Sequence, residues 1–151
     1  VALCRDRHLP VVVMHAQGLP QTMQENPQYD DVVLDVYDFL HRQIDNLVRL
    51  GLARDQIIAD PGIGFGKTVS HNLALLNRIS LFHGLGAPLL LGASRKGFIR
   101  VIGKPLDAND RMPGSIAVGL AALSQGVQIL RVHDVSDTRQ AVNLWQAVLG
   151  G

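Results

Sequence analysis

The chain has 151 residues, of which 47% are hydrophobic and 18% charged, a composition typical of one globular domain with a sizeable core. Its formal net charge is +1, from 14 basic and 13 acidic residues without a basic run, which argues against nucleic acid as a partner. The single cysteine, Cys4, excludes a disulfide framework, and no apolar run approaches the ~20 residues of a membrane span. We therefore expect a cytoplasmic protein that binds no membrane. Because the chain begins without Met, in what reads as the tail of a helix, we also expect a fragment.

Strands and helices are predicted to alternate along the chain. Aliphatic and β-branched runs predict strands at residues 10–14, 56–60, 88–92 and 127–132, and the first two of these are expected to be buried. Periodic apolar residues and capping residues, Ser70 among them, predict helices at residues 30–50, 70–82, 109–126 and 137–149. This alternation predicts an α/β fold with parallel strands and right-handed crossovers. It leaves two architectures open, a doubly wound sheet or part of a (β/α)₈ barrel.

In both architectures the chemistry gathers at the carboxyl ends of the strands. Those ends carry "MHAQG", "DPGIGFGK", "GASRKG" and "RVHD". Met14 is by default a core residue, although its place at a strand end also allows a ligand contact. Polar, glycine-rich loops at four strand ends are hard to explain by folding alone. One rim is therefore expected to present Met14, Asp60, Lys96, Arg131 and His133.

The stretch "DPGIGFGKT", residues 60–68, resembles a phosphate-binding loop but fails its spacing. A P-loop needs four residues between its first glycine and Gly-Lys, whereas Gly62 and Gly66 enclose three. A dinucleotide-binding pattern fails because the third glycine comes too early. The glycines would instead let the backbone approach a flat ligand, with Phe65 as an apolar wall, or they would only form a tight turn with positive φ. Both interpretations stay open.

Asp60 and Lys67 begin and end this motif. A carboxylate at the end of a buried strand needs a partner. Asp60 could cap the turn through the amides of Gly62 and Ile63, or it could accept paired N–H donors from a ligand. Lys67 is expected to be exposed to solvent.

Basic residues follow the two later strands. In "SRKG", Arg95 and Lys96 precede a helix start, which suits an anion or a carbonyl group, or they form an ordinary exposed pair. In "RVHD", Arg131 and His133 share one side of the strand because alternate residues do, and this pair suits a phosphate. Arg131 could alternatively pair with Asp134.

The assembled motifs resemble the dihydropteroate synthase family. The resemblance covers nearly the whole chain, through "VVVMHAQGLPQTMQ", "DPGIGFGKTVSHNLALL", "LLLGASRKGFI", "DRMPGSIAV" and "RVHDV" in family order. It implies a TIM (β/α)₈ barrel of which this chain is about the last four βα units, a half barrel. Residues 1–151 would be the C-terminal half of a pterin-binding barrel, with the N-terminal half absent and the fragment alone inactive.

The family implies an activity and roles for residues. It condenses 7,8-dihydropterin-6-ylmethyl diphosphate with 4-aminobenzoate in folate biosynthesis, giving dihydropteroate and pyrophosphate, and it is a sulfonamide target. Lys96 would reach the pterin carbonyl and ring nitrogen, Arg131 would stack on the pterin, and His133 with Arg131 would face the diphosphate, so these three are the expected catalytic residues. The expected substrate-binding residues are Asp60 on the pterin N–H groups, Met14, Gly64, Phe65 and Gly92 in the pocket, and Ser94, Arg95 and Gly97 near the aminobenzoate.

The resemblance also implies Mg²⁺ on the diphosphate, held by a ligand in the missing half, and a homodimer through the C-terminal helices. Some family members have a hydroxyl residue at the position of Gly97, so the aminobenzoate carboxylate would here rely on backbone N–H groups. Two alternatives stay open. One is a related pterin-binding domain of a methyltetrahydrofolate methyltransferase, which would not need the Arg131 and His133 pair. The other is a non-catalytic half-barrel interaction module.

Overall fold

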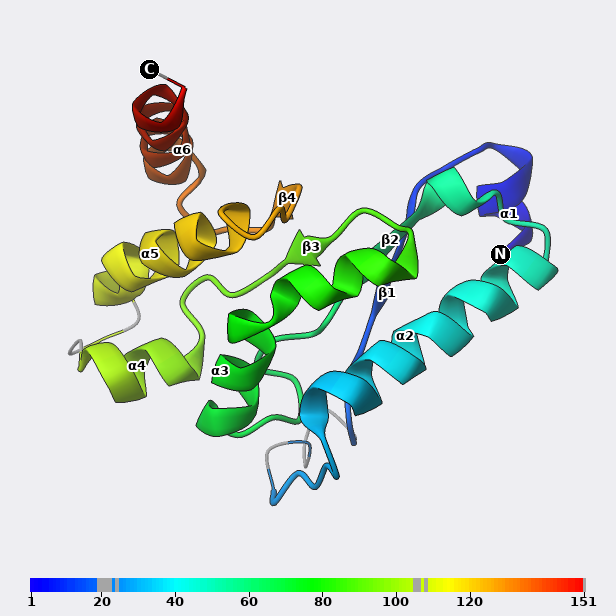
Figure 1. Cartoon of the computed structure of the whole chain (residues 1–151), viewed down its shortest axis with the longest axis horizontal. Coiled ribbons are helices and arrows are strands. Elements are labelled where there is room, and N and C mark those ends of the chain that lie inside the picture. The colour runs from blue at the N-terminus through cyan, green and yellow to red at the C-terminus, as the bar shows by residue number, and fades with distance from the viewer. Residues whose placement is uncertain (19–22, 24, 105–106, 108, 151) are drawn as a thin grey trace.

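The described part of the computed structural model comprises residues 1–18, 23, 25–104, 107 and 109–150, and it contains parallel strands in chain order (Figure 1). Strand β1 (Val11–Met14) pairs with β2 (Ile57–Asp60), and β3 (Leu90–Leu91) pairs with β4 (Ile129–Leu130). A parallel bridge from Ala59 to Leu89 connects the two pairs. The prediction of parallel strands is confirmed for these pairs.

The strands differ in burial, and the sequence-based prediction of a fully buried strand at residues 10–14 is wrong. The inner strands β2 and β3 are almost entirely buried, whereas β1 and β4 are partly exposed, with Val12 exposed by 48%. The reason is position, because β1 and β4 each have one neighbouring strand within the described part of the chain. The residues of both strands are mostly aliphatic, but the outer edge of each strand has no neighbouring strand within the described residues.

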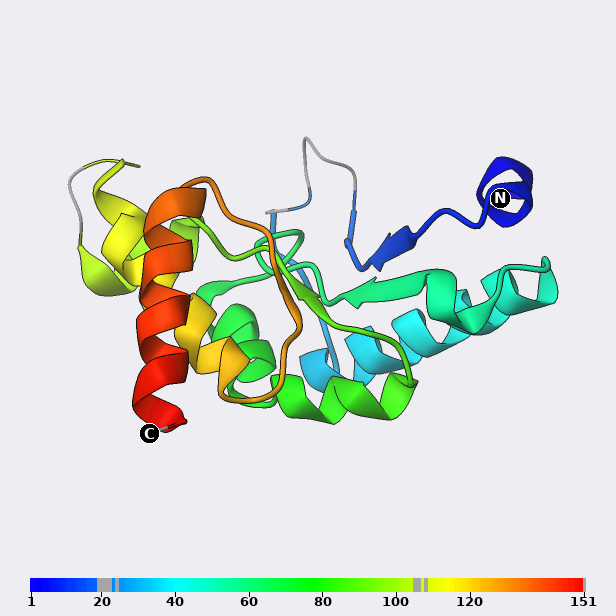
Figure 2. The same cartoon turned by 90° about the horizontal axis from the view of Figure 1, so that it is seen from above.

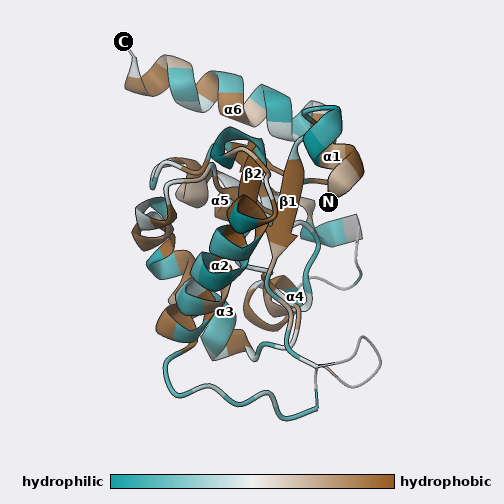
Figure 3. Ribbon diagram, turned by 90° about the vertical axis from the view of Figure 1, so that its right-hand side faces the viewer, coloured by the Kyte–Doolittle hydropathy of each residue, from teal (hydrophilic) through white to brown (hydrophobic). Residues whose placement is uncertain are grey.

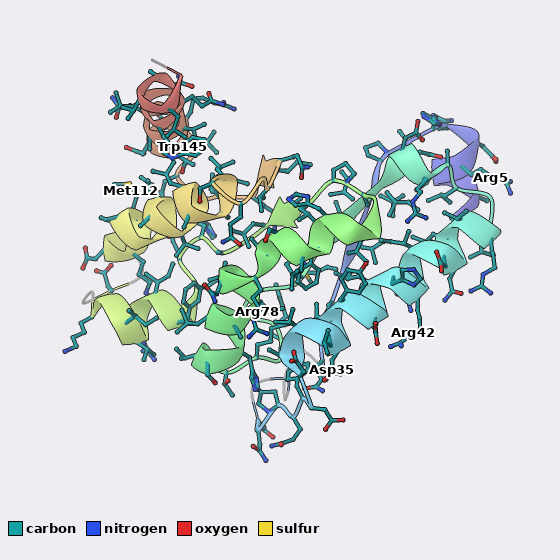
Figure 4. The ribbon with its side chains drawn as sticks, in the orientation of Figure 1. Arg5, Asp35, Arg42, Arg78, Met112 and Trp145 are labelled. Carbon is teal, nitrogen blue, oxygen red and sulfur yellow. The ribbon has the colours of Figure 1, made fainter. Side chains whose placement is uncertain are left out.

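Helix α2 (Val32–Arg49) shows how the sequence sets one element of the core. Asp31 caps the helix, its Oδ1 accepting from the N–H groups of Val33 and Leu34 at 2.8 and 3.2 Å. Arg42 projects from the exposed face (Figure 4), and Figure 3 shows this face as hydrophilic beside the hydrophobic β1 and β2. The buried face, at three-and-four spacing, consists of Val32, Val33, Val36, Leu40 and Ile44.

The segment after β2 departs from the expected single helix. Thr68, not Ser70, is the N-cap of α3 (Val69–Asn77), because its Oγ1 accepts from the His71 N–H at 3.2 Å. After Asn77 the chain continues as a 3-10 helix, Ile79–Leu85. Figure 2 shows this 3-10 helix and α2 along the same side of the strands. Together with α3 and the strands they form the core around Leu40, Ile44, Ile57, Leu75, Ile79, Phe82, Leu89 and Leu91.

The other helices complete the described part of the chain. They are α1 (Ala2–Asp6), α4 (Gly97–Gly103), α5 (Met112–Leu123) and α6 (Val135–Leu149), with short 3-10 helices at Arg54–Gln56 and Asn109–Arg111. Helix α6 packs against α5 at the edge of the molecule (Figure 1). Within the described ranges, every helix is too short or too polar to span a membrane.

Candidate functional site

A cavity of about 310 Å³ opens among the loops that follow β2, β3 and β4. All of its lining residues except Val132 were expected site residues from the sequence, and Val132 occupies the position between the expected pair in "RVHD". The strand ends therefore bring together side chains that are up to 68 positions apart in the chain. The lining consists of Phe65, Gly92, Ser94, Lys96, Arg131, Val132 and His133.

Asp60 lies at the end of β2, opposite Met14 in the register of the parallel pair. Its side chain is buried, with 2% exposed, and Oδ1 accepts the Gly62 N–H at 2.8 Å. The turn-capping interpretation is thus observed. Burial raises the pKa of Asp60, while the Gly62 hydrogen bond and the positive charges of Arg131, Lys67 and Lys96 act in the opposite direction. This carboxylate therefore interacts electrostatically with the cations of the site.

The glycine loop is tight because it lies against the segment that follows β1. Gly62 has φ +69, and a Cβ there would lie 1.8 Å from the His15 carbonyl oxygen. Gly64 has φ +80, and a Cβ there would lie 2.9 Å from Cδ of Lys96. Side chains at these positions would be strained by both φ and space. The loop therefore combines the two functions that the sequence left open, a positive-φ turn and a close approach of backbone to a site residue.

Lys67 corrects the sequence-based expectation, because it is buried with 3% exposed. Its Nζ donates to the carbonyl oxygens of Gly62 at 3.0 Å and Phe65 at 3.1 Å, and contacts His15 Nδ1 at 2.9 Å. Burial lowers the pKa of Lys67 to about 7; Asp60 raises it and Lys96 lowers it further. Sequence reasoning missed His15 as well, although its place directly after β1 in "MHAQG" was a usable signal.

Lys96 lies above the ring of Phe65, with Nζ 3.8 Å from the ring centroid. Burial lowers the pKa of Lys96, Arg131 lowers it further, and Asp60 raises it. Lys96 is also the N-cap residue of α4, so the end of β3 carries its side chain into the cavity. A cation on an aromatic face is held by the ring quadrupole and stays close to any flat ligand in this cavity.

Arg131 and His133 line the same cavity although β4 ends at Leu130. The guanidinium of Arg131 lies against Gly92, where a Cβ would be 2.7 Å from Nη2. His133 Nδ1 is 3.0 Å from Ser94 Oγ, and the His133 N–H donates to the same oxygen at 3.3 Å. Gly92 thus makes room for a planar cation, and Ser94 sets the orientation of the imidazole.

Arg95 is directed to another partner. Its backbone has φ +57, and its guanidinium forms a two-pronged ion pair with Asp134, with Nε 3.1 Å from Oδ2. This hydrogen bond lowers the pKa of Asp134. The alternative that Arg131 pairs with Asp134 is therefore corrected, since Arg95 holds that carboxylate. Arg95 does not line the cavity described above; Gly97 begins α4, with open space where a Cβ would lie.

The functional roles assigned to these residues stay predictions, but their convergence at one rim is a structural fact. Two cations, an imidazole, a hydroxyl group, an aromatic ring and a glycine line the cavity, and the buried Asp60 carboxylate interacts with both cations. Such a cavity suits a flat polar ligand that carries an anionic group.

Comparison with known proteins identifies the family. Residues 1–133 match the sequence profile of the family described as "Pterin binding enzyme". The dihydropteroate synthase of Escherichia coli (strain K12) is 45% identical over 143 residues, which cover 93% of this chain and 50% of that protein. The chain thus spans about half the length of the curated relatives it matches.

Solved structures agree. The chain matches a Yersinia pestis dihydropteroate synthase, solved with a sulfonamide drug complex, at a TM-score of 0.93 and 38% identity, covering 99% of this chain and 54% of that one. It matches the Thermus thermophilus dihydropteroate synthase in complex with 4-aminobenzoate at a TM-score of 0.92 and 40% identity, covering 98% and 60%. A second Thermus thermophilus structure is in complex with 6HMPPP. The chain belongs to the pterin-binding enzyme family and is a homologue of the dihydropteroate synthases.

Proposed function

We propose that this chain is the C-terminal half, residues 1–151, of a dihydropteroate synthase that condenses 7,8-dihydropterin-6-ylmethyl diphosphate with 4-aminobenzoate. The observation that carries the proposal is the single cavity in which Lys96, Arg131 and His133 converge close to Asp60. The Thermus thermophilus relatives in complex with 4-aminobenzoate and 6HMPPP support it. The reaction would give 7,8-dihydropteroate and pyrophosphate.

The pterin would be clamped on two sides. Lys96 Nζ lies 3.8 Å from the centroid of the Phe65 ring, and the planar guanidinium of Arg131 lies against Gly92. Lys96 would donate to the ring carbonyl and a ring nitrogen, while Asp60 would accept N–H groups at the other edge. A guanidinium can stack on the flat ring, which an ammonium group cannot do equally well.

The leaving diphosphate would lie at Arg131 and His133. Ser94 contacts His133 through Nδ1, so Nε2 is the nitrogen that would donate to a diphosphate oxygen. Departure of diphosphate from a methylene group conjugated to an electron-rich ring favours a loose, cation-like transition state. Such a step needs fixed charges around the leaving group and a clamp on the ring rather than a protein nucleophile.

The family also implies Mg²⁺, which would neutralise charge on the diphosphate when bound. Over the described ranges, no group of three or more His, Cys, Asp or Glu side chains could hold a metal ion. The residues of this cavity therefore do not fit a metal cage. We assign no step to the metal.

We further propose that this chain supplies four consecutive βα units of a (β/α)₈ barrel, the N-terminal half supplying the others. The outer edges of β1 and β4 support this, since each pairs with one strand in the described structure. Unpaired edges invite pairing with another chain. The 151-residue chain alone is expected to self-associate or to need its other half. A stable, cooperatively folding monomer in sedimentation and thermal unfolding would contradict the half-barrel proposal.

A homodimer through the C-terminal helices is part of the same proposal. Helix α6 exposes Leu144 by 67% and Val148 by 75%.

An apolar groove of about 560 Å³ lies between α3, α4 and α5 and is larger than the strand-end cavity, with which it shares no lining residue. This groove lacks the charged side chains that the chemistry needs, so we assign it to no substrate.

Binding measurements on the complete enzyme, meaning this chain joined to its N-terminal half, test the proposed function. We expect calorimetry to detect 7,8-dihydropterin-6-ylmethyl diphosphate but only much weaker binding of methyltetrahydrofolate, which has no diphosphate for Arg131 and His133. The reverse preference would favour a methyl-transfer domain. Binding of neither compound would favour the non-catalytic interaction module.

A further inference from the structure

The most deeply buried cation in the described structure, Lys67, has no role in the chemistry above. Its ammonium group has three N–H donors, and three acceptors surround it: the Gly62 and Phe65 carbonyl oxygens and His15 Nδ1. We propose that Lys67 is a positioning residue of the pterin pocket, which holds the 62–66 loop in the shape that places Phe65 beneath Lys96. The inference rests on the proposed function for its substrate.

The contacts of Lys67 fix both ends of one turn. The Phe65 N–H donates to the Gly62 carbonyl oxygen at 3.1 Å, closing the turn, and Lys67 Nζ reaches the carbonyl groups of both residues. Asn72 contacts the middle of the same turn, where its Oδ1 accepts the Gly64 N–H at 2.7 Å. Lys67 thus spans the turn that carries Gly64 and Phe65, and these two residues touch Lys96.

His15 connects the same ammonium group to the preceding strand end. When Lys67 is protonated its nitrogen can only donate, so Nδ1 of His15 then accepts and the ring proton lies on Nε2. The backbone N–H of His15 also donates to the backbone carbonyl oxygen of Asp60 at 3.1 Å. Burial lowers the pKa of His15 to about 4, with Lys67 the next cause, and so His15 stays neutral near pH 7. The contact ties the end of β1 to the glycine loop.

The consequence for binding is selective. Phe65 belongs to the 62–66 loop and lies against Lys96, whereas Arg131 lies on Gly92 and His133 is held by Ser94. Loss of the Lys67 contacts therefore displaces the surface under the pterin ring and leaves the β3 and β4 ends in place. A residue needed only for stability would affect all substrates alike.

Kinetics of Lys67→Ala in the complete enzyme test this inference, with Lys104→Ala at an exposed lysine as the matched control. We expect the KM for the pterin diphosphate to rise at least about tenfold, as for a buried polar mismatch, while the KM for 4-aminobenzoate changes less than about twofold. Propylammonium, which has three N–H donors, is expected to restore pterin binding, and tetramethylammonium, which has none, is not. Equal rises in both KM values, or equal effects of the two cations, would overturn the proposal.

Hydrogen exchange on Lys67→Met, which keeps the side-chain volume, needs no activity. Amides of residues 62–66 are expected to exchange at least about tenfold faster than in the unchanged protein, and those of residues 92–97 at the same rate. Unchanged exchange at 62–66, or faster exchange throughout, would overturn the positioning role. Failure of the unchanged enzyme and of Lys104→Ala to bind pterin diphosphate would instead refute the proposed function.

Discussion

Asp60→Asn is expected to weaken pterin binding at least about tenfold in the complete enzyme, because a mismatched buried polar pair costs roughly 1–3 kcal/mol. Oδ1 of Asp60 already accepts the Gly62 N–H at 2.8 Å. An asparagine can keep that hydrogen bond, and its NH₂ group would then occupy the place of Oδ2. The asparagine NH₂ group and the pterin N–H group, which are both donors, would then face each other without an acceptor. Calorimetric titration with a pterin that lacks diphosphate measures the effect.

The control for this experiment is Asp137→Asn, at an exposed aspartate of α6. Its pterin affinity is expected to equal that of the unchanged enzyme, and both variants are expected to keep the circular dichroism of the fold. Because burial raises the pKa of Asp60 above 3.8, acid should also weaken binding as the pH falls through that raised value. Asp60→Asn should lack this pH dependence. Unchanged pterin affinity in Asp60→Asn would leave Asp60 with the turn-capping role alone.

Arg131→Lys is expected to reduce turnover by at least about a hundredfold, which is the loss that follows when one preorganised hydrogen-bond donor to the transition state is removed. Lysine keeps the charge, but it loses the planar fork and the stacking face. The guanidinium of Arg131 fits flat against Gly92, which has no side chain to exclude it. Steady-state kinetics of the complete enzyme measure the effect, with Arg42→Lys, on the exposed face of α2, as the control (Figure 4).

His133→Ala is expected to separate the two parts of the substrate. Its ring is held by Ser94 and lines the cavity with Arg131, so its loss should weaken binding of the pterin diphosphate. Affinity for a pterin without diphosphate should stay nearly unchanged. Equal loss of affinity for both compounds would contradict the assignment of His133 to the leaving group.

For Arg131, full turnover in the charge-conserving Arg131→Lys enzyme would contradict the proposed stacking of its guanidinium on the pterin.

The sequence could predict much of this site because parallel strands place their carboxyl ends together. Strand prediction alone therefore put Asp60, Lys96, Arg131 and His133 on one rim, and the cavity contains the last three. The roles of these residues came from the family resemblance, not from the pattern. The shape of the glycine loop could also be predicted, because its spacing excludes a P-loop and leaves a positive-φ turn or a close approach of the backbone to other groups. Gly62 and Gly64 both have positive φ, and both lie close to other residues.

What the sequence could not predict depends on partners far along the chain. Lys67 looked solvent-exposed because a lysine is buried only where acceptors surround it, and one of them, His15, lies 52 positions away. The ion pair of Arg95 could not be predicted either, because its partner Asp134 lies 39 positions away. The cap of α3 was misplaced for a local reason, because Thr68 and Ser70 both carry hydroxyl groups suited to capping.

The condensation reaction tests the central claim most directly. The complete enzyme, incubated with 7,8-dihydropterin-6-ylmethyl diphosphate, 4-aminobenzoate and Mg²⁺, is expected to form dihydropteroate and pyrophosphate in equal amounts. A Lys96→Ala enzyme, which lacks the ammonium group above Phe65, is expected to form neither at a comparable rate. Absence of both products from a folded, complete enzyme, or an undiminished rate in Lys96→Ala, would contradict the account.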